Sequence, residues 1–254
     1  MFTSEGLGLA GRGEPVGRVS RGRSCSGVPL SLLRVLIVIV VVLSLKPVPA
    51  VHADTLTVCE NGSCDYPTIK DAVDAAFSGD TISLLDTVFT ESGILVDKNV
   101  TIVGGNTAGT IIQAAEAEGE ATDRVLEIWS DAEVILEDVT VRYGNVEASL
   151  ARGGGILNYG TLTLKHVTVE ANSAVGLPGD PGWLAEGGGV YNEGILVIRA
   201  STIQGNRAVG GRGNPGADGG DGHGGGIFAG AGGSVDLVNS TVSGNVAHGG
   251  SGGG

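Results

Sequence analysis

The sequence predicts an all-β fold, namely a right-handed parallel β-helix solenoid that begins with a short capping helix. Three observations predict it. A segment of 25 to 27 residues recurs three times, at 152–176, 186–210 and 223–249. The rest of the chain after residue 80 consists of short stretches rich in Val, Ile, Leu and Thr, broken by Gly, Asn and Asp. The inserts between the copies vary while the copies do not, which is typical of a stacked solenoid whose inserts leave it as loops.

Each copy has the same internal plan. It begins with three glycines and an aliphatic residue, at 153–156, 187–190 and 224–227. It ends with an aliphatic residue, two spacers and an asparagine, from Val169 to Asn172, Ile203 to Asn206 and Val242 to Asn245. We expect the glycines to form tight corners at which a Cβ atom would clash.

The length of the copies decides which solenoid they build. Helical repeats are excluded by the glycine and β-branched content, and a propeller blade needs about 40 residues or more. The copies instead suit three short strands, which make one lap of a three-sided coil whose parallel laps stack ~4.8 Å apart. The expected rows across laps are Leu162, Leu196 and Leu237, then Leu164 and Ile198, then Thr168, Thr202 and Thr241, and a corner ladder of Asn172, Asn206 and Asn245, with Asn145 as an earlier, degenerate rung.

Residues 1–53 are predicted to be a signal peptide with a long polar start. The apolar run at 35–45 is too short to span a bilayer comfortably, arginines precede it, and the small-residue pattern "VHA" follows at 51–53. The alternative is an uncleaved membrane anchor. The prediction places the protein outside the cell or on its surface, with no stable membrane span in the mature chain.

Residues 54–79 are predicted to form an N-terminal cap. Cys59 and Cys64 flank an Asn-Gly turn in an exported chain, so we expect a local disulfide; no further Cys or close His completes a metal site. A helix is expected over 67–79, with Pro67 at its first position and Gly79 after its end, covering the open end of the stack. Residues 80–254 are assigned to the repeats. They end where a further glycine block would begin, so we expect a truncated sequence.

The charge of the chain limits its partners. Of 15 Lys and Arg residues six lie in 1–53, and of 28 Asp and Glu residues two do, which leaves a net charge of about −17 on the remainder. This negative charge argues against nucleic acid and anionic membrane surfaces as binding partners, because both are negatively charged themselves.

The motifs resemble those of a known family. The blocks Gly154-Gly155-Ile156, Gly188-Gly189-Val190 and Gly225-Gly226-Ile227, each followed by an aliphatic-x-x-Asn block, resemble the repeats of polymorphic outer membrane proteins, with an aliphatic residue in place of the family's Phe. The stretch at 66–84 is similar to the first lap of pectin-lyase-like right-handed parallel β-helices. The resemblance covers most of 54–254 and implies the fold; function is left open, because this fold hosts lyases, hydrolases, adhesins and inert stalks.

The acidic and basic residues between 124 and 142 could act in catalysis or simply lie on the solvated surface of the strands. A lyase would need an acidic calcium cluster and a basic residue, and a glycosidase two or three converging carboxylates. The candidates are Arg124, Glu127, Asp131, Glu133, Glu137, Asp138 and Arg142. Solvated outward positions of half-buried strands explain them better, and His166, at the position of Ala200 and Asn239, suits a surface residue. We therefore expect no catalytic residue in this stretch.

No metal site or cofactor is predicted. Asp218, Asp221 and His223 resemble a calcium-binding nonapeptide, but its apolar anchor is missing and the period is not nine. Calcium therefore stays a secondary alternative.

The predicted function is that of an exported, surface-exposed repeat module, adhesin-like or structural. Its partner would be a surface glycan or a protein, contacted by the variable inserts through Trp183 and Arg212. The alternative is a carbohydrate-active enzyme, of polysaccharide lyase or glycoside hydrolase type, whose active laps are degenerate or missing.

Overall fold

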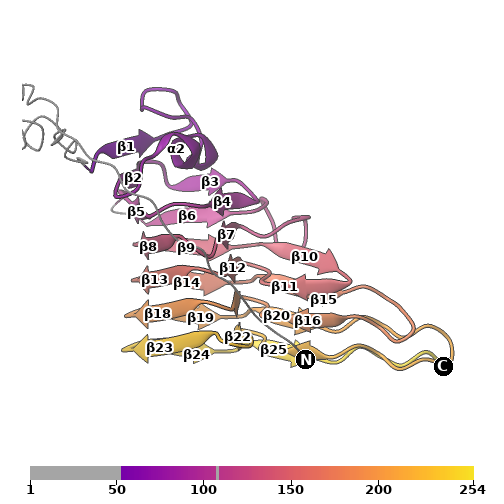
Figure 1. The fold of residues 1–254 in the computed structure, drawn as a ribbon. Coiled ribbons are helices and arrows are strands. Elements are labelled where there is room, and N and C mark those ends of the chain that lie inside the picture. Colours follow the sequence, from indigo (N-terminus) through magenta and orange to yellow (C-terminus); the bar gives the residue numbers. More distant parts are fainter. Residues whose placement is uncertain (1–52, 107–108) are drawn as a thin grey trace, which may run out of the picture. The chain divides into compact units, whose positions relative to one another are not determined.

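The computed structural model describes residues 53–106 and 109–254, which form an all-β parallel solenoid with one helix (Figure 1). The signal peptide predicted for 1–53 lies outside the described residues, apart from Ala53. Strands from successive laps lie side by side, and the colours of Figure 1 run down the stack from the indigo first lap to the yellow last one.

Three sheets form the body of the solenoid. Sheet A contains β1 (Thr55–Val58), β2 (Thr81–Leu84), β5 (Val100–Gly104), β8 (Glu133–Glu137), β13 (Thr161–Lys165), β18 (Ile195–Arg199) and β23 (Ser234–Val238). Sheet B contains β3 (Val88–Thr90), β6 (Thr110–Gln113), β9 (Val139–Arg142), β14 (Thr168–Glu170), β19 (Thr202–Gln204) and β24 (Thr241–Ser243). Sheet C contains β4 (Ile94–Val96), β7 (Leu126–Ile128), β12 (Ile156–Asn158), β17 (Val190–Asn192) and β22 (Ile227–Ala229).

Two further sheets form a projection that we call the wing. Sheet D contains β10 (Asn145–Ala148), β15 (Ser173–Gly176), β20 (Arg207–Val209) and β25 (Val246–His248). Sheet E contains β11 (Leu150–Arg152), β16 (Leu184–Glu186) and β21 (Gly222–His223). Each repeat lap passes through sheets C, A, B, D and E in turn, so a lap has five strands rather than the three expected. The predicted inserts are therefore partly strands of the wing.

The inward rows follow the alternation of the strands. Leu162 pairs with Leu196 and Leu164 with Ile198, and all four are buried. The prediction that Leu237 continues the row of Leu162 and Leu196 is wrong. Leu237 pairs with Ile198, and Val235 takes the place beside Leu196. The turn before β23 spans 230–233, whereas the turn before β18 has only two residues, so the third copy is shifted by two positions.

An asparagine ladder lies at the corner between sheets B and D. The Nδ2 group of Asn172 donates to Oδ1 of Asn206 at 2.9 Å, and that of Asn206 donates to Oδ1 of Asn245 at 2.9 Å. The backbone N–H groups of Asn172 and Asn206 donate to the same oxygens. The rung above is Gly144, whose N–H donates to Asn172, so Asn145 is not the earlier rung as expected but pairs with Ser173 instead.

The ladder explains the last glycine of each glycine block. A Cβ atom on Gly189 would lie 2.9 Å from Cγ of Asn206, and one on Gly155 would lie 2.7 Å from Cγ of Asn172. The first glycine has another reason: Gly187 has a φ of +69°, in the left-handed region. The glycine block and the asparagine of each repeat therefore pack directly against each other, although they lie far apart in the sequence.

The N-terminal cap contains the disulfide and the helix. Cys59 and Cys64 are bonded, which confirms the predicted disulfide. The helix α2 (Ile69–Ala75) contacts β1, β2 and β4, and its Ile69, Ala72 and Val73 are buried in the core at this end of the stack.

The helix is shorter than the predicted 67–79. Thr68 is its N-cap and accepts a hydrogen bond from the Asp71 N–H, so Pro67 precedes the cap. The helix ends early because the carboxylate of Asp80 accepts the N–H of Phe77 and forms a turn there, which leaves Phe77 75% exposed.

The wing is thin because its two sheets meet through small residues. Ala151, Ala174, Ala185 and Ala208 are buried between them. Farther out, hydrogen bonds zigzag between outgoing and returning segments: Gly211 N–H donates to the Trp183 carbonyl, Gly220 to Gly211, and Gly250 to Gly220, all at 2.7–2.8 Å. A Cβ atom on Gly220 would lie 2.1 Å from the Trp183 carbonyl oxygen, so this packing requires glycine.

Replacing Asn206 by alanine is expected to destabilise the solenoid strongly. The change leaves the buried N–H of Asn172 without its acceptor, while the Asn172 Nδ2 group keeps the carbonyls of Val141 and Glu170, and a buried group left unpaired costs roughly 1–3 kcal/mol. We expect a loss of about 1–3 kcal/mol in the free energy of unfolding, measured by urea denaturation. The control is Gln204→Ala at the end of β19, an exposed amide whose loss should cost less than about 0.5 kcal/mol. Equal losses for the two variants would contradict the role given to the ladder.

Candidate functional site

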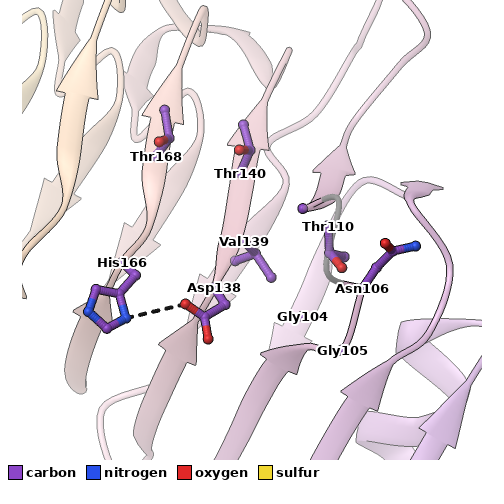
Figure 2. A pocket seen from close by; sticks show the side chains of 10 residues that line it. Gly104, Gly105, Asn106, Thr110, Asp138, Val139, Thr140, His166 and Thr168 are labelled. Atoms are coloured by element: carbon purple, nitrogen blue, oxygen red, sulfur yellow. Dashed lines mark ion pairs between the residues drawn. The ribbon is translucent and has the colours of Figure 1, made fainter.

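An open groove of about 470 Å³ runs along the corner between sheets A and B (Figure 2). It is lined by Gly104, Gly105, Asn106, Gly109, Thr110, Asp138, Val139, Thr140, His166 and Thr168. Gly104 is required by close packing at the wall of the groove, because a Cβ atom there would lie 2.2 Å from the Asp138 carbonyl oxygen. Because the lining is made of hydroxyl, amide and glycine groups, the groove is polar and nearly free of charge except at one end.

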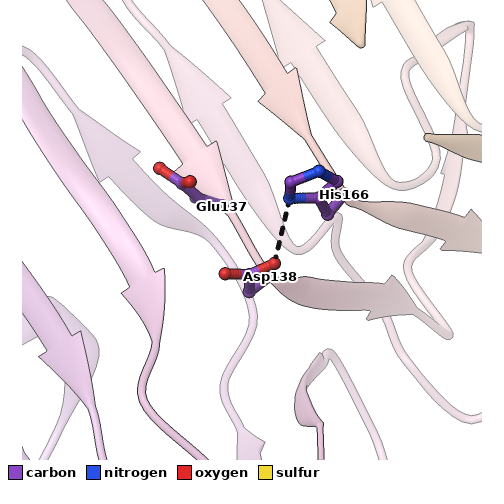
Figure 3. A group of neighbouring side chains, drawn as sticks. All are labelled: Glu137, Asp138 and His166. Atoms are coloured by element: carbon purple, nitrogen blue, oxygen red, sulfur yellow. Dashed lines mark ion pairs between the residues drawn. The ribbon is translucent and has the colours of Figure 1, made fainter. Parts of the chain in front are cut away.

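That charged end consists of residues that follow sheet A. Asp138 and His166 occupy equivalent corner positions and have φ values of 56° and 53°, as do Ala200 and Asn239 below them at 48° and 52°. The tight turn directs the side chains outward, and Nδ1 of His166 lies 3.2 Å from Oδ1 of Asp138 (Figures 2 and 3). Both side chains are more than half exposed, so their attraction is largely screened by solvent.

Glu137 completes the only group of three potential metal-ligating side chains found in the described ranges. One ligand atom each from Glu137, Asp138 and His166 lie within 4.8 Å of one another (Figure 3). The Lys165 ammonium is 3.8 Å from the Glu137 carboxylate and competes with a cation for it. No such group is formed by the residues that resemble a calcium-binding nonapeptide, Asp218, Asp221 and His223.

The geometry of these residues limits the chemistry of the groove. Glycosidases place two carboxyl groups on opposite sides of the scissile bond. Among the residues that line the groove, Asp138 has the one carboxyl group, and Glu137 beside it in the chain does not line the groove. The groove can therefore donate and accept hydrogen bonds, but no pair of carboxyl groups flanks a substrate there.

The other predicted candidates are dispersed around the solenoid. Glu127 lies on the outer face of sheet C, where it binds Arg124 at 2.7 Å. Glu133 lies on the outer face of sheet A and Asp131 on the turn before it. Arg142 lies on sheet B, where its guanidinium donates to Gln113. The structure brings together two pairs of the candidates, Glu137 with Asp138 and Arg124 with Glu127.

A cluster that the sequence did not suggest joins the wing to the body. Arg152 of β11 binds Glu186 of the neighbouring strand β16 at 2.9 Å, and its guanidinium lies 4.5 Å from the ring centre of Tyr191 on sheet C. The Tyr191 hydroxyl donates to Glu193 at 2.6 Å. Phe228 stacks on Tyr191 in the next lap. The only signal in the sequence was their equal place in successive copies.

The cluster perturbs two pKa values. Burial raises the pKa of Tyr191, and its hydrogen bond with Glu193 adds to the rise. Burial alone would lower the pKa of Arg152, but the hydrogen bond with Glu186 and the nearby carboxylates outweigh it and raise the pKa overall. Both groups therefore keep their protons, and the cluster serves as a fixed connection rather than a proton-transfer site.

The two insert residues predicted to contact a ligand both lie in the wing. Trp183 is 49% exposed, and the wing residues Leu150, Leu177 and Leu184 are also exposed. Leu150 pairs with Leu184 across β11 and β16, and the Trp183 N–H donates to the Leu177 carbonyl. We call these four residues the wing patch. The exposed Arg212 belongs to the next lap, where its carbonyl accepts the N–H of Gly179.

No protein-family model, curated protein or solved structure matches the chain. Within the described residues, no helix has the length and apolar character needed to cross a membrane.

Replacing Glu186 by glutamine is expected to weaken the connection between the wing and the body. Glu186 is almost fully buried and loses a charge-assisted hydrogen bond, which is typically worth roughly 1.5–3 kcal/mol. We expect a loss of that order in thermal or urea unfolding. The control is Asp236→Asn, which removes an ion pair with Arg199 whose side chains are 62% and 52% exposed, and it should change stability little. A neutral Glu186→Gln would contradict the structural role of the cluster.

Proposed function

We propose that this chain is an exported, surface-exposed repeat module, adhesin-like or structural, that binds a partner without catalysing a reaction. We further propose that its solenoid is a right-handed parallel β-helix, similar to pectin-lyase-like proteins and to polymorphic outer membrane protein repeats. Crossovers between parallel strands are right-handed in about 98% of known cases, which supports the handedness. Export is supported by the leader at 1–53, with the cap at 54–79 and the repeats at 80–254.

The observation that carries the binding function is the wing patch. The wing patch exposes apolar side chains on the wing, which is separate from the hydrophobic core of the body. Its residues are Leu150, Leu177, Trp183 and Leu184. Large apolar side chains left exposed on a projection are a feature expected of an interaction surface. Their aliphatic character favours a protein over a glycan as the partner at this surface, with Arg212 beside it as a polar contact.

The alternative is a carbohydrate-active enzyme, and the groove is the place to weigh it. Asp138 has the one carboxyl group among its lining residues, which does not suit acid–base catalysis by a pair of carboxyl groups across a sugar bond. The residues that line the groove do not provide the second catalytic side chain that a lyase or a hydrolase mechanism requires. No cofactor is part of the proposal, and calcium is included as a condition of the test.

The enzyme alternative predicts bond cleavage, and our proposal predicts none. Purified 54–254 is incubated with pectate, other acidic glycans and neutral glycans, with and without calcium, and new reducing ends and unsaturated products are measured. We expect no product above a blank. Reproducible cleavage that Glu137→Gln or Asp138→Asn abolishes, while Glu133→Gln does not, would overturn the non-catalytic function.

The wing patch predicts a binding defect that leaves the fold intact. Binding of 54–254 to immobilised gelatin, fibrinogen and mucin is measured by biolayer interferometry. The double variant Trp183→Ser, Leu184→Ser should lower binding at least tenfold on every protein that the parent binds, because buried aromatic anchors dominate interfaces. The control is Phe77→Ser in the cap, which is 75% exposed. If the double variant binds as well as the parent, the wing patch is not the binding surface and a plain stalk remains.

A further inference from the structure

A second exposed tryptophan lies on the body of the solenoid, at the turn from sheet C to sheet A. Trp129 follows β7 and is 50% exposed, and Tyr159 follows β12 in the next lap. Ile128 pairs with Asn158, so the two aromatic residues lie at the same position of successive laps. By the same register Asp97 precedes Trp129 in this column, and Glu193 follows Tyr159.

The column is held by the backbone of the stack. The Trp129 N–H donates to Val96 at 3.0 Å, Tyr159 to Ile128 at 2.9 Å, and Glu193 to Asn158 at 2.8 Å. The turn residues are therefore fixed by lap-to-lap hydrogen bonds, and a ligand that binds there does not have to order a loop.

A hollow of about 380 Å³ opens at this column. Its lining consists of Glu127, Trp129, Ser130 and Tyr159, which are two aromatic side chains with a carboxylate and a hydroxyl beside them. Such a lining suits a ligand that has both apolar faces and hydroxyl groups at its rim. An aromatic ring packs against the C–H face of a sugar ring, and the polar groups bond its hydroxyls.

The charges of the hollow decide which ligand of this kind fits. The Glu127 carboxylate is already neutralised by the Arg124 guanidinium at 2.7 Å, so it is a poor partner for a cation. Asp131, Glu133 and Asp97 are exposed close by along the chain and disfavour an anion. The favoured ligand is therefore uncharged.

We propose that Trp129 and Tyr159 form a binding site for a neutral, β-1,4-linked hexopyranose chain that lies along the column. Neighbouring laps are ~4.8 Å apart, which is close to the length that one such sugar residue adds to its chain. Consecutive sugar residues can then pack on consecutive laps, with Asp97 and Glu193 at the two ends to accept bonds from their hydroxyls. The site is distinct from the groove and from the wing patch.

The two tryptophans of the chain allow a direct test. In Trp183→Phe, Trp129 is the only tryptophan left, and its fluorescence reports on the hollow. Cellohexaose is titrated into this variant of 54–254, with choline chloride and hexagalacturonate titrated in parallel. We expect a saturable change in emission with cellohexaose and a response at least tenfold weaker with the charged ligands.

Matched variants locate the binding. Isothermal titration with cellohexaose should show at least tenfold weaker binding for Trp129→Ala and for Tyr159→Ala. Trp183→Ala removes a tryptophan of equal exposure and should bind as the parent does. Circular dichroism checks that each variant folds.

Three outcomes would overturn the proposal: no saturable response to cellohexaose, binding that Trp183→Ala removes and Trp129→Ala spares, or a stronger response to choline or to hexagalacturonate. Each is separate from the test of the proposed function. Binding of gelatin or mucin through the wing patch and the absence of bond cleavage can both hold whether or not this hollow takes a sugar.

Discussion

Hydrogen bonding between equivalent residues of successive laps is the constraint on which the rest of this molecule depends. One lap of the coil cannot bury its own apolar side chains, so each lap needs a neighbour in exact register. The asparagine ladder enforces that register at one corner, where the amide of Asn206 binds Asn172 above it and Asn245 below it. A slip by one residue would turn the inward leucines outward and break these buried bonds.

The same register explains why glycine is so frequent. At the repeat corners, glycine leaves room for the asparagine side chains, as Gly189 does for Asn206. In the wing, Gly211 and Gly220 allow segments to approach until their backbones bond directly. The wing therefore stays thin, and the hydrophobic residues buried between its sheets are four alanines and Val146. Larger apolar groups such as Trp183 remain exposed at its surface.

Function in such a scaffold depends on the residues that are not repeated from lap to lap. The repeated residues pack against one another, whereas the exposed residues that differ between laps can form binding sites. At the turn after sheet C the column changes from Asp97 to Trp129, Tyr159 and Glu193, so one short stretch of a regular edge becomes aromatic. At the turn after sheet A, the same variation gives Asp138 and His166 and then Ala200. A stiff stack holds each of these groups in place for binding.

Periodicity in the sequence was enough to predict an all-β stack of parallel laps, the asparagine column and the local disulfide, because each of these depends on spacing along the chain. It was not enough for features that depend on which laps meet in space. The helix ends at Ala75 because the Asp80 carboxylate forms a turn with Phe77, and Leu237 moves to another row because its turn is longer.

The candidate sites divide in the same way. Trp183 and Arg212 could be assigned to variable inserts from the sequence, but the pairing of Leu150 on β11 with Leu184 on β16 is set by the stacking of the laps. Trp129 and Tyr159 are 30 residues apart, and nothing in their local sequence links them. The sequence by itself determined the repeat and therefore the stack. The tertiary structure decided which exposed residues become neighbours, because the lengths of the intervening turns set the lap-to-lap register.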